Sequence, residues 1–151
     1  MIEITVDDLK LQEELSKLKD KFEDLSPLML TLSESILYST QENFSSEGKR
    51  LPAGDNWPSL SDWTLKERAK RGHGVPPGKM LQDTGILIGS LTTSYDATSA
   101  VCGTNIIYAA IQHFGGGPTG LNTFIPPRPF MELIDQDLDD MMEDVMSYLG
   151  K

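Results

Sequence analysis

The chain has 151 residues, a formal net charge of −10, and 38% hydrophobic residues. This length and composition predict a single domain spanning residues 1–151 and exclude a disordered tail or a membrane protein. The N-terminal residues do not have the pattern of a signal peptide. The acidic balance argues against a protein that coats nucleic acid. The single cysteine, Cys102, excludes an intrachain disulfide and a cysteine-based zinc site, and favours synthesis in a reducing compartment.

The N-terminal part of the chain is predicted to hold one short strand and two helices. Apolar and polar residues alternate over residues 2–6, which indicates a strand. Apolar residues then recur at steps of four and three from Leu11 to Leu25, which indicates an amphipathic helix. Ser26 is the expected N-cap and Pro27 the first helical residue, a typical helix start, so a second helix is predicted from Pro27 to about Phe44.

The middle of the chain is predicted to consist of loops around a short basic helix. Residues 45–56 have a loop composition, and Asp62–Arg71 reads as a helix with Ser59 or Ser61 as its cap. The glycine- and proline-rich residues 72–79 form a second loop, and we expect mobility over about 66–80. The basic segment, residues 66–79, contains one acidic residue, Glu67, and five basic residues: Lys66, Arg68, Lys70, Arg71 and Lys79.

The C-terminal half is predicted to contain a hairpin and two helices. Residues 87–95 and 100–103 read as strands, residues 106–114 as a short helix capped by Asn105, and residues 130–149 as an acidic helix. The predicted fold class is therefore α+β, with N-terminal helices and an acidic C-terminal helix packed on a small antiparallel sheet.

A glycine- and proline-rich segment follows the short helix. Gly115 begins a run of three glycines, which is costly to order, and prolines at 126, 127 and 129 each remove a backbone donor. Apolar residues on both sides favour a rigid loop over a disordered connector. We expect Phe114 and Phe130 to be buried anchors of this loop.

No catalytic, cofactor-binding or metal site is predicted. The acidic run that begins at Asp135 lacks the glycine and glutamate of a calcium loop and reads as a solvated helix face. Neither His73 nor His113 has catalytic or metal-ligating partners in the sequence, and Cys102 reads as a core residue. The three glycines lack the lysine of a phosphate loop. An enzyme using His113 is a minor alternative.

Three further features have a structural interpretation. Trp57 and Trp63 are interpreted as anchors of the central loop on the core. The basic residues 66–79 and the acidic residues 132–144 are either two solvated faces or surfaces that pair between copies of the chain or with a partner. Both interpretations remain open from the residues alone.

Five motifs, in this order, resemble the bacteriophage virion morphogenesis family, the tail completion proteins of Mu-like and related contractile-tailed phages. The resemblance covers roughly residues 1–149. The motifs are Trp57-Pro58-Ser59-Leu60 before Thr64 and a basic stretch, Met80 to Leu87 with Ser90-Leu91, Val101 and Gly103 before Tyr108-Ala109, Ile111 to Gly116, and Ile125 to Phe130 before an acidic helix.

The resemblance implies a structural protein of the phage neck, located in the virion and in the host cytoplasm during assembly. It would complete or terminate the tail and permit head–tail joining as a ring, often a hexamer, with no substrate and no cofactor. Its partners would be itself, tail tube or tail terminator proteins and head–neck connector proteins. DNA would pass through an acidic lumen without specific binding. A head-closure or adaptor protein on the capsid side and a non-virion regulatory module are the alternatives.

For this role we predict an interface that combines the loop with the basic segment. Its central residue is Arg128, whose planar guanidinium could bind carboxylates within the fold or across a junction. If the loop is an interface, we expect Arg128→Ala to impair joining more than folding. The predicted interface residues are Arg128, Pro129, Phe130, His113, Gly115, Gly116, Lys66, Arg68, Lys70 and Arg71.

Overall fold

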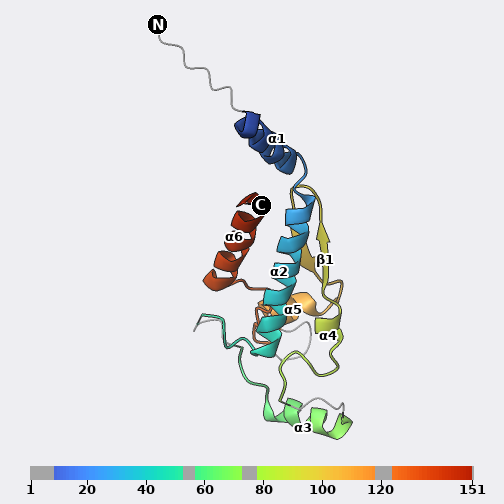
Figure 1. Ribbon diagram of the computed structural model, residues 1–151. Coiled ribbons are helices and arrows are strands. Elements are labelled where there is room, and N and C mark those ends of the chain that lie inside the picture. Colours follow the sequence, from blue (N-terminus) through green and yellow to red (C-terminus); the bar gives the residue numbers. More distant parts are fainter. Residues whose placement is uncertain (1–8, 53–56, 73–77, 118–123, 151) are drawn as a thin grey trace.

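The computed structural model describes residues 9–52, 57–72, 78–117 and 124–150, and within them it is α+β, as predicted. A long central helix, α2 (Ser26–Ser45), packs against α6 (Asp135–Gly150) on one side. On the other side it packs against a two-stranded antiparallel sheet (Figure 1). The first helix, α1 (Leu9–Glu23), continues beyond the end of α2, away from the rest of the molecule (Figure 1).

The two N-terminal helices lie close to their predicted bounds. The junction is only two residues long, and the Asp24 Oδ1 atom accepts a hydrogen bond from the Ser26 N–H at 2.9 Å. Ser26 is therefore the first helical residue rather than the predicted cap, and Pro27 lies in the first turn, where its missing N–H costs nothing. The predicted strand at residues 2–6 lies outside the described residues.

The short basic helix α3 (Asp62–Arg71) confirms its prediction. Ser61 is its cap, because its Oγ accepts a hydrogen bond from the Thr64 N–H, and Gly72 ends it in the left-handed conformation. Most of the following predicted loop, residues 73–77, lies outside the described residues, so the predicted mobility of residues 66–80 stays a prediction.

The hairpin is shorter than predicted. Its strands are β1 (Thr92–Tyr95) and β2 (Ala100–Gly103), paired in the register that sets Thr92 opposite Gly103. The predicted strand start at Leu87 was wrong, because Ile86–Gly89 forms the one-turn helix α4. Gly85 adopts a positive φ at its start, and α4 turns Leu87 into the core.

The hairpin turn is held by the side chain of Asp96. Its carboxylate accepts hydrogen bonds from the backbone and side chains of Thr98 and Ser99. These bonds, the one from the Ser99 hydroxyl first, lower the pKa of Asp96 to about 2. The Asp96 carboxylate therefore holds the turn as an anion over the whole neutral range.

The last two helices begin later than predicted. The short helix α5 spans Ala109–Phe114, and its N-cap residue is Tyr108, which makes no side-chain cap hydrogen bond, so the predicted cap Asn105 was wrong. The predicted start of the last helix at Phe130 was also wrong. The carbonyls of Phe130 and Glu132 accept hydrogen bonds from the Asn43 side chain on α2, so this segment stays irregular until α6 begins.

The core forms where α2 ends. Phe44 and Phe130 are fully buried, and the Phe44 ring lies 5.3 Å from that of Phe130 and 5.7 Å from that of Trp57. Gly48 lets the Trp57 ring approach, because a Cβ there would lie 2.5 Å from its Cδ1 atom. Trp57 thus anchors its loop as predicted, whereas Trp63 is exposed on α3, so that prediction was wrong.

Candidate interaction surface

The glycine-rich and proline-rich segments bind each other where the described chain resumes after residue 117. Gly116 and Ile125 exchange two backbone hydrogen bonds of 2.9 and 2.8 Å. The Arg128 N–H then donates to the Gln112 carbonyl of α5 at 2.9 Å. These bonds close the base of the loop and hold the proline-rich segment against α5. The prediction of a shaped loop is confirmed at this base.

Gly115 permits the closest approach within this base. Its φ of 70° and ψ of 177° define a conformation that is essentially restricted to glycine. A Cβ at this position would lie 2.7 Å from the Pro127 nitrogen and 2.9 Å from the Ile125 carbonyl oxygen. The sequence therefore needs a glycine at residue 115 so that the two segments can meet.

Arg128 is buried and has an internal partner. Its Nε and Nη2 atoms donate to the Pro58 carbonyl at 3.2 and 2.8 Å, which ties the proline-rich segment to the chain before α3. Burial lowers the pKa of Arg128, and the nearby Arg68 guanidinium lowers it further, yet an arginine remains charged at any physiological pH. The Arg128 guanidinium thus binds a carbonyl of its own chain. This burial indicates that Arg128→Ala also impairs folding, whereas the prediction that it impairs joining more than folding stays a prediction.

His113 also has an internal role. Its ring meets Phe130 and Phe114 edge-on, at centroid distances of 5.1 and 4.5 Å, and its Nδ1 atom lies 3.5 Å from the Met131 N–H, a long hydrogen bond. Burial lowers the pKa of His113, opposed by the Glu132 carboxylate, so the ring is neutral at pH 7 and can accept this bond. The contacts of His113 are those of a packing residue.

An exposed apolar ridge lies on α5 and the turn that precedes it. Ile107 lies in this turn and Ile111 and Phe114 lie on the helix, and we call the three residues the α5 ridge. Ile107 is 99% exposed and Phe114 is 77% exposed, so the prediction that Phe114 is a buried anchor was wrong. Beside Phe114, an apolar groove of about 290 Å³ runs between α5 and Met131. Phe124, on the opposite arm of the loop, is exposed as well.

The basic helix α3 is partly neutralised within the chain. Asp83 forms ion pairs with Arg71 at 2.9 Å and with Arg68 at 3.6 Å, and Lys70 pairs with Glu67 at 2.7 Å. Arg68 also donates to the Lys79 carbonyl. The predicted basic patch is therefore weaker than its composition suggests, because most of its charges have partners nearby.

The structure brings together only part of the predicted interface. His113, Gly115, Gly116, Arg128 and Phe130 converge at the base of the loop, and Pro129 lies between the last two. Arg68 lines a groove of about 420 Å³ with Arg128, between α3 and the proline-rich segment. Lys66, Lys70 and Arg71 lie elsewhere on α3. The exposed members of the surface, Ile107, Ile111 and Phe124, were not among the predicted residues, although the helical spacing of the α5 ridge was visible in the sequence.

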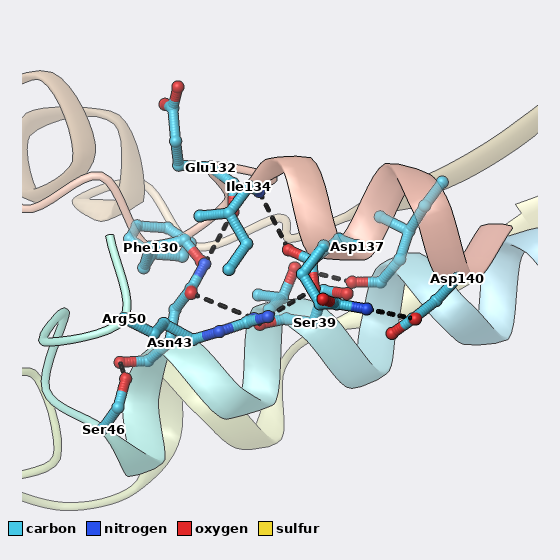
Figure 2. A network of polar contacts seen from close by, with 12 residues as sticks. Ser39, Asn43, Ser46, Arg50, Phe130, Glu132, Ile134, Asp137 and Asp140 are labelled. Atoms are coloured by element: carbon cyan, nitrogen blue, oxygen red, sulfur yellow. Dashed lines mark hydrogen bonds and ion pairs between the residues drawn. The ribbon is translucent and has the colours of Figure 1, made fainter. Parts of the chain in front are cut away.

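A buried polar network, also missed from sequence, fixes α6 to α2 (Figure 2). Arg50 forms an ion pair with Asp137 and donates to the Ser39 carbonyl at 3.0 Å. Asn43 reaches the segment before α6, and the Asp137 Oδ2 atom accepts from the Ile134 N–H at 2.9 Å. Asp137 was predicted to lie on a solvated face, but it is buried.

The electrostatics of Asp137 follow from these contacts. Burial alone would raise its pKa, but hydrogen bonds from the Ile134 N–H, the Arg50 guanidinium and the Ser39 hydroxyl outweigh burial and lower it. Asp137 is therefore ionised at neutral pH and caps α6 as a carboxylate.

Other chemistry has little support among the described residues. They contain no group of three or more histidine, cysteine or acidic residues placed to hold a metal ion. None of the helices in the described ranges is both long and apolar enough to cross a membrane. Cys102 is half-buried, and burial raises the pKa of its thiol, in agreement with the predicted packing role.

Comparison with known proteins agrees with the resemblance seen in the sequence. The model of the phage virion morphogenesis family matches residues 6–150. The chain is 32% identical over 150 residues to the Mu-like prophage FluMu G protein 2 of Haemophilus influenzae, which covers 98% of this chain and 96% of that protein. It is also 32% identical over 132 residues to the putative capsid assembly protein G of Escherichia phage Mu, covering 86% and 82% of the two chains. No solved structure gives a significant match.

Proposed function

Because this chain belongs to the phage virion morphogenesis family, we propose that it completes or terminates the phage tail and permits head–tail joining as a ring at the neck. The observation that carries the proposal is the exposed α5 ridge, which stands on a rigid base made by the Gly115–Pro127 approach and the Arg128–Pro58 bonds. A rigid surface can bind a partner without the entropy cost of ordering a loop.

The α5 ridge is the surface of a binding protein rather than the site of an enzyme. Large exposed apolar residues that gather in one patch mark interaction surfaces. The groove beside Phe114 is apolar, and its titratable residue, His113, is neutral and packed against two aromatic rings. In this proposal the protein acts by binding its partners, without a substrate or a cofactor.

The proposed partners are further copies of the chain, tail tube or tail terminator proteins, and head–neck connector proteins. A ring, for which six copies is our working number, requires two different surfaces on each copy that meet between neighbours. The net charge of −10 supports an acidic lumen through which DNA slides without binding. The protein would be found in the virion at the neck, after assembly in the host cytoplasm.

A head-closure or adaptor role on the capsid side is the second candidate. The observation that favours it is the name of the phage Mu relative, a putative capsid assembly protein. A non-virion regulatory module is the third, and detection of the chain in purified particles by mass spectrometry would eliminate it.

Deletion of the gene, followed by negative-stain electron microscopy of the lysate, tests the proposal. Full heads beside unjoined or overlong tails, rescued by the added protein, are the expected result. Normally joined particles would contradict it, and retention of the protein by purified portal protein but not by tail tubes would favour the capsid side.

The α5 ridge is tested in the same complementation. Phe114→Asp should abolish rescue while the variant stays folded, because Phe114 is exposed. Tyr38→Asp is the matched control, since Tyr38 is also an exposed aromatic residue but lies on α2. Equal rescue by both variants would contradict the role of the ridge.

A further inference from the structure

The helix α1 has an apolar side with little to pack against in its own chain. Leu18 and Phe22, spaced by one turn, are exposed. In the described part of the chain, α1 makes no extensive contact with another helix or strand. Figure 1 shows it extending beyond the body of the molecule. A lone helix of 15 residues is marginally stable in water, so the apolar side of α1 needs a partner.

The outer face of α6 has a matching feature. Leu138, Met142 and Met146 recur at steps of four and are all exposed, whereas the face toward α2 carries the buried Asp137. We call these three residues the α6 stripe. Residues spaced by four form one ridge of a helix, and two such ridges interdigitate in the commonest type of helix packing. Leu18 and Phe22 of α1 form a ridge of the same spacing.

The charges beside the two stripes are complementary. Every charged residue from 129 to 150 is acidic, and Asp135, Asp139 and Glu143 are exposed on α6. The second half of α1 carries Lys17, Lys19 and Lys21 against two acidic residues, Asp20 and Glu23, so its balance is basic. Lys17 and Lys19 pair with exposed glutamates of α1 itself, and such pairs contribute little to stability.

The junction between α1 and α2 opposes folding of α1 onto the α6 stripe of its own chain. The Lys21 ammonium donates to the Tyr148 carbonyl, and the Tyr148 hydroxyl donates to the Asp24 carbonyl, both at 3.3 Å. These bonds join the end of α1 to the end of α6, and only two residues separate α1 from α2. Folding back would require breaking both bonds and bending this short junction sharply.

We propose that the exposed ridge of α1 packs on the α6 stripe of a second copy of the same chain. The two surfaces differ, so the α1 of each copy can bind the α6 stripe of the next copy. The same contact then repeats from copy to copy. The inference deepens the proposed ring by naming the residues that join its neighbours. It is tested in solution without tails, so its failure is distinguishable from failure of the tail role.

Disulfide cross-linking between differently tagged copies tests the proposal. In a Cys102→Ala background, one batch carries Phe22→Cys and the other carries Met142→Cys. Mixing under mild oxidation should give at least tenfold more mixed dimer than the same experiment with Trp63→Cys in place of Met142→Cys. Trp63 is a suitable control because it is exposed on a helix, α3, that belongs to neither surface.

Two results would overturn the proposal. Mixed dimer no more abundant than in the Trp63→Cys control would show that the two surfaces do not meet. An intrachain disulfide in a chain carrying both Phe22→Cys and Met142→Cys, without mixed dimer, would show that α1 folds onto its own α6. Because these side chains are exposed, the variants should remain folded, and circular dichroism of each batch checks this.

A second measurement is independent of cysteine chemistry. Sedimentation velocity at rising concentration should show self-association that Phe22→Glu abolishes, because the new charge would face the acidic side of α6. Trp63→Glu should leave the association unchanged. Self-association that is equal in both variants, or absent in the unmodified protein, would also overturn the proposal.

Discussion

Gly115 and Pro127 approach so closely that a single added carbon at Gly115 would lie 2.7 Å from the Pro127 nitrogen. The two residues belong to the two arms of the loop, and their approach lets the proline-rich segment pack against the end of α5. The glycine and the prolines therefore act together. Glycine gives the close approach, and proline fixes the opposing backbone without needing a hydrogen-bond partner for its nitrogen.

We predict that Gly115→Ala lowers the free energy of unfolding by about 2–4 kcal/mol. The methyl group would clash with backbone atoms, and alanine is strained at this φ and ψ. Gly117→Ala is the matched control, since nothing lies within 4 Å of a Cβ there, and it should change the stability by less than about 0.5 kcal/mol. Urea denaturation of the two variants measures the difference, and equal stabilities would contradict the prediction.

Arg128→Ala is predicted to destabilise the protein by roughly 2–3 kcal/mol, the usual cost of losing hydrogen bonds from a charged group. The Pro58 carbonyl would lose both of its donors from this side chain. Arg128→Lys keeps the charge but cannot donate two hydrogen bonds to one carbonyl in the same way. Its stability should therefore lie between that of Arg128→Ala and that of the unmodified protein. Unchanged thermal denaturation of Arg128→Ala would contradict the internal role and restore the idea of a free interface residue.

The sequence was a good guide wherever local signals decide the structure. The start of α2 is set by Asp24, Ser26 and Pro27, and α3 is bounded by Ser61 and Gly72, all of which act within a few residues. The hairpin strand Ala100–Gly103 was likewise predicted at its observed bounds. The helix α4 was missed because a single turn is too short to show a helical period.

Prediction from the sequence failed where contacts between distant segments determine the structure. The late start of α6 depends on Asn43, 89 residues before Glu132, and the burial of Asp137 depends on Arg50. No spacing rule connects such residues. The exposure of Phe114 was missed for a different reason, since an apolar stripe on a helix looks the same whether it faces a core or a partner. The glycine and proline loop was predicted to be rigid, but the partner of Arg128, the Pro58 carbonyl, was not predicted.

Phe130 and Phe114 should differ sharply in their contributions to stability. Phe130 is fully buried against Phe44, so Phe130→Ala should lower the free energy of unfolding by about 3–5 kcal/mol. Phe114→Ala should change it by less than about 0.5 kcal/mol, because the ring is exposed. Chemical denaturation measures both values. A large loss of stability in Phe114→Ala would contradict its placement on the exposed ridge.

Asp137→Asn should reduce stability at neutral pH by about 3 kcal/mol, the lower end of the cost of breaking a buried ion pair, because Arg50 remains partly exposed. The pKa of Asp137 is lowered in the folded state, so the unfolded state binds more protons in acid. Its stabilising effect is therefore complete above the ordinary aspartate pKa of about 3.9 and is lost as the pH falls through the lower folded value. Urea denaturation at pH 7 and pH 3 should show the gap between Asp137→Asn and the unmodified protein shrinking in acid. A gap of equal size at both pH values would mean that the charge of Asp137 does not stabilise the junction of α2 and α6.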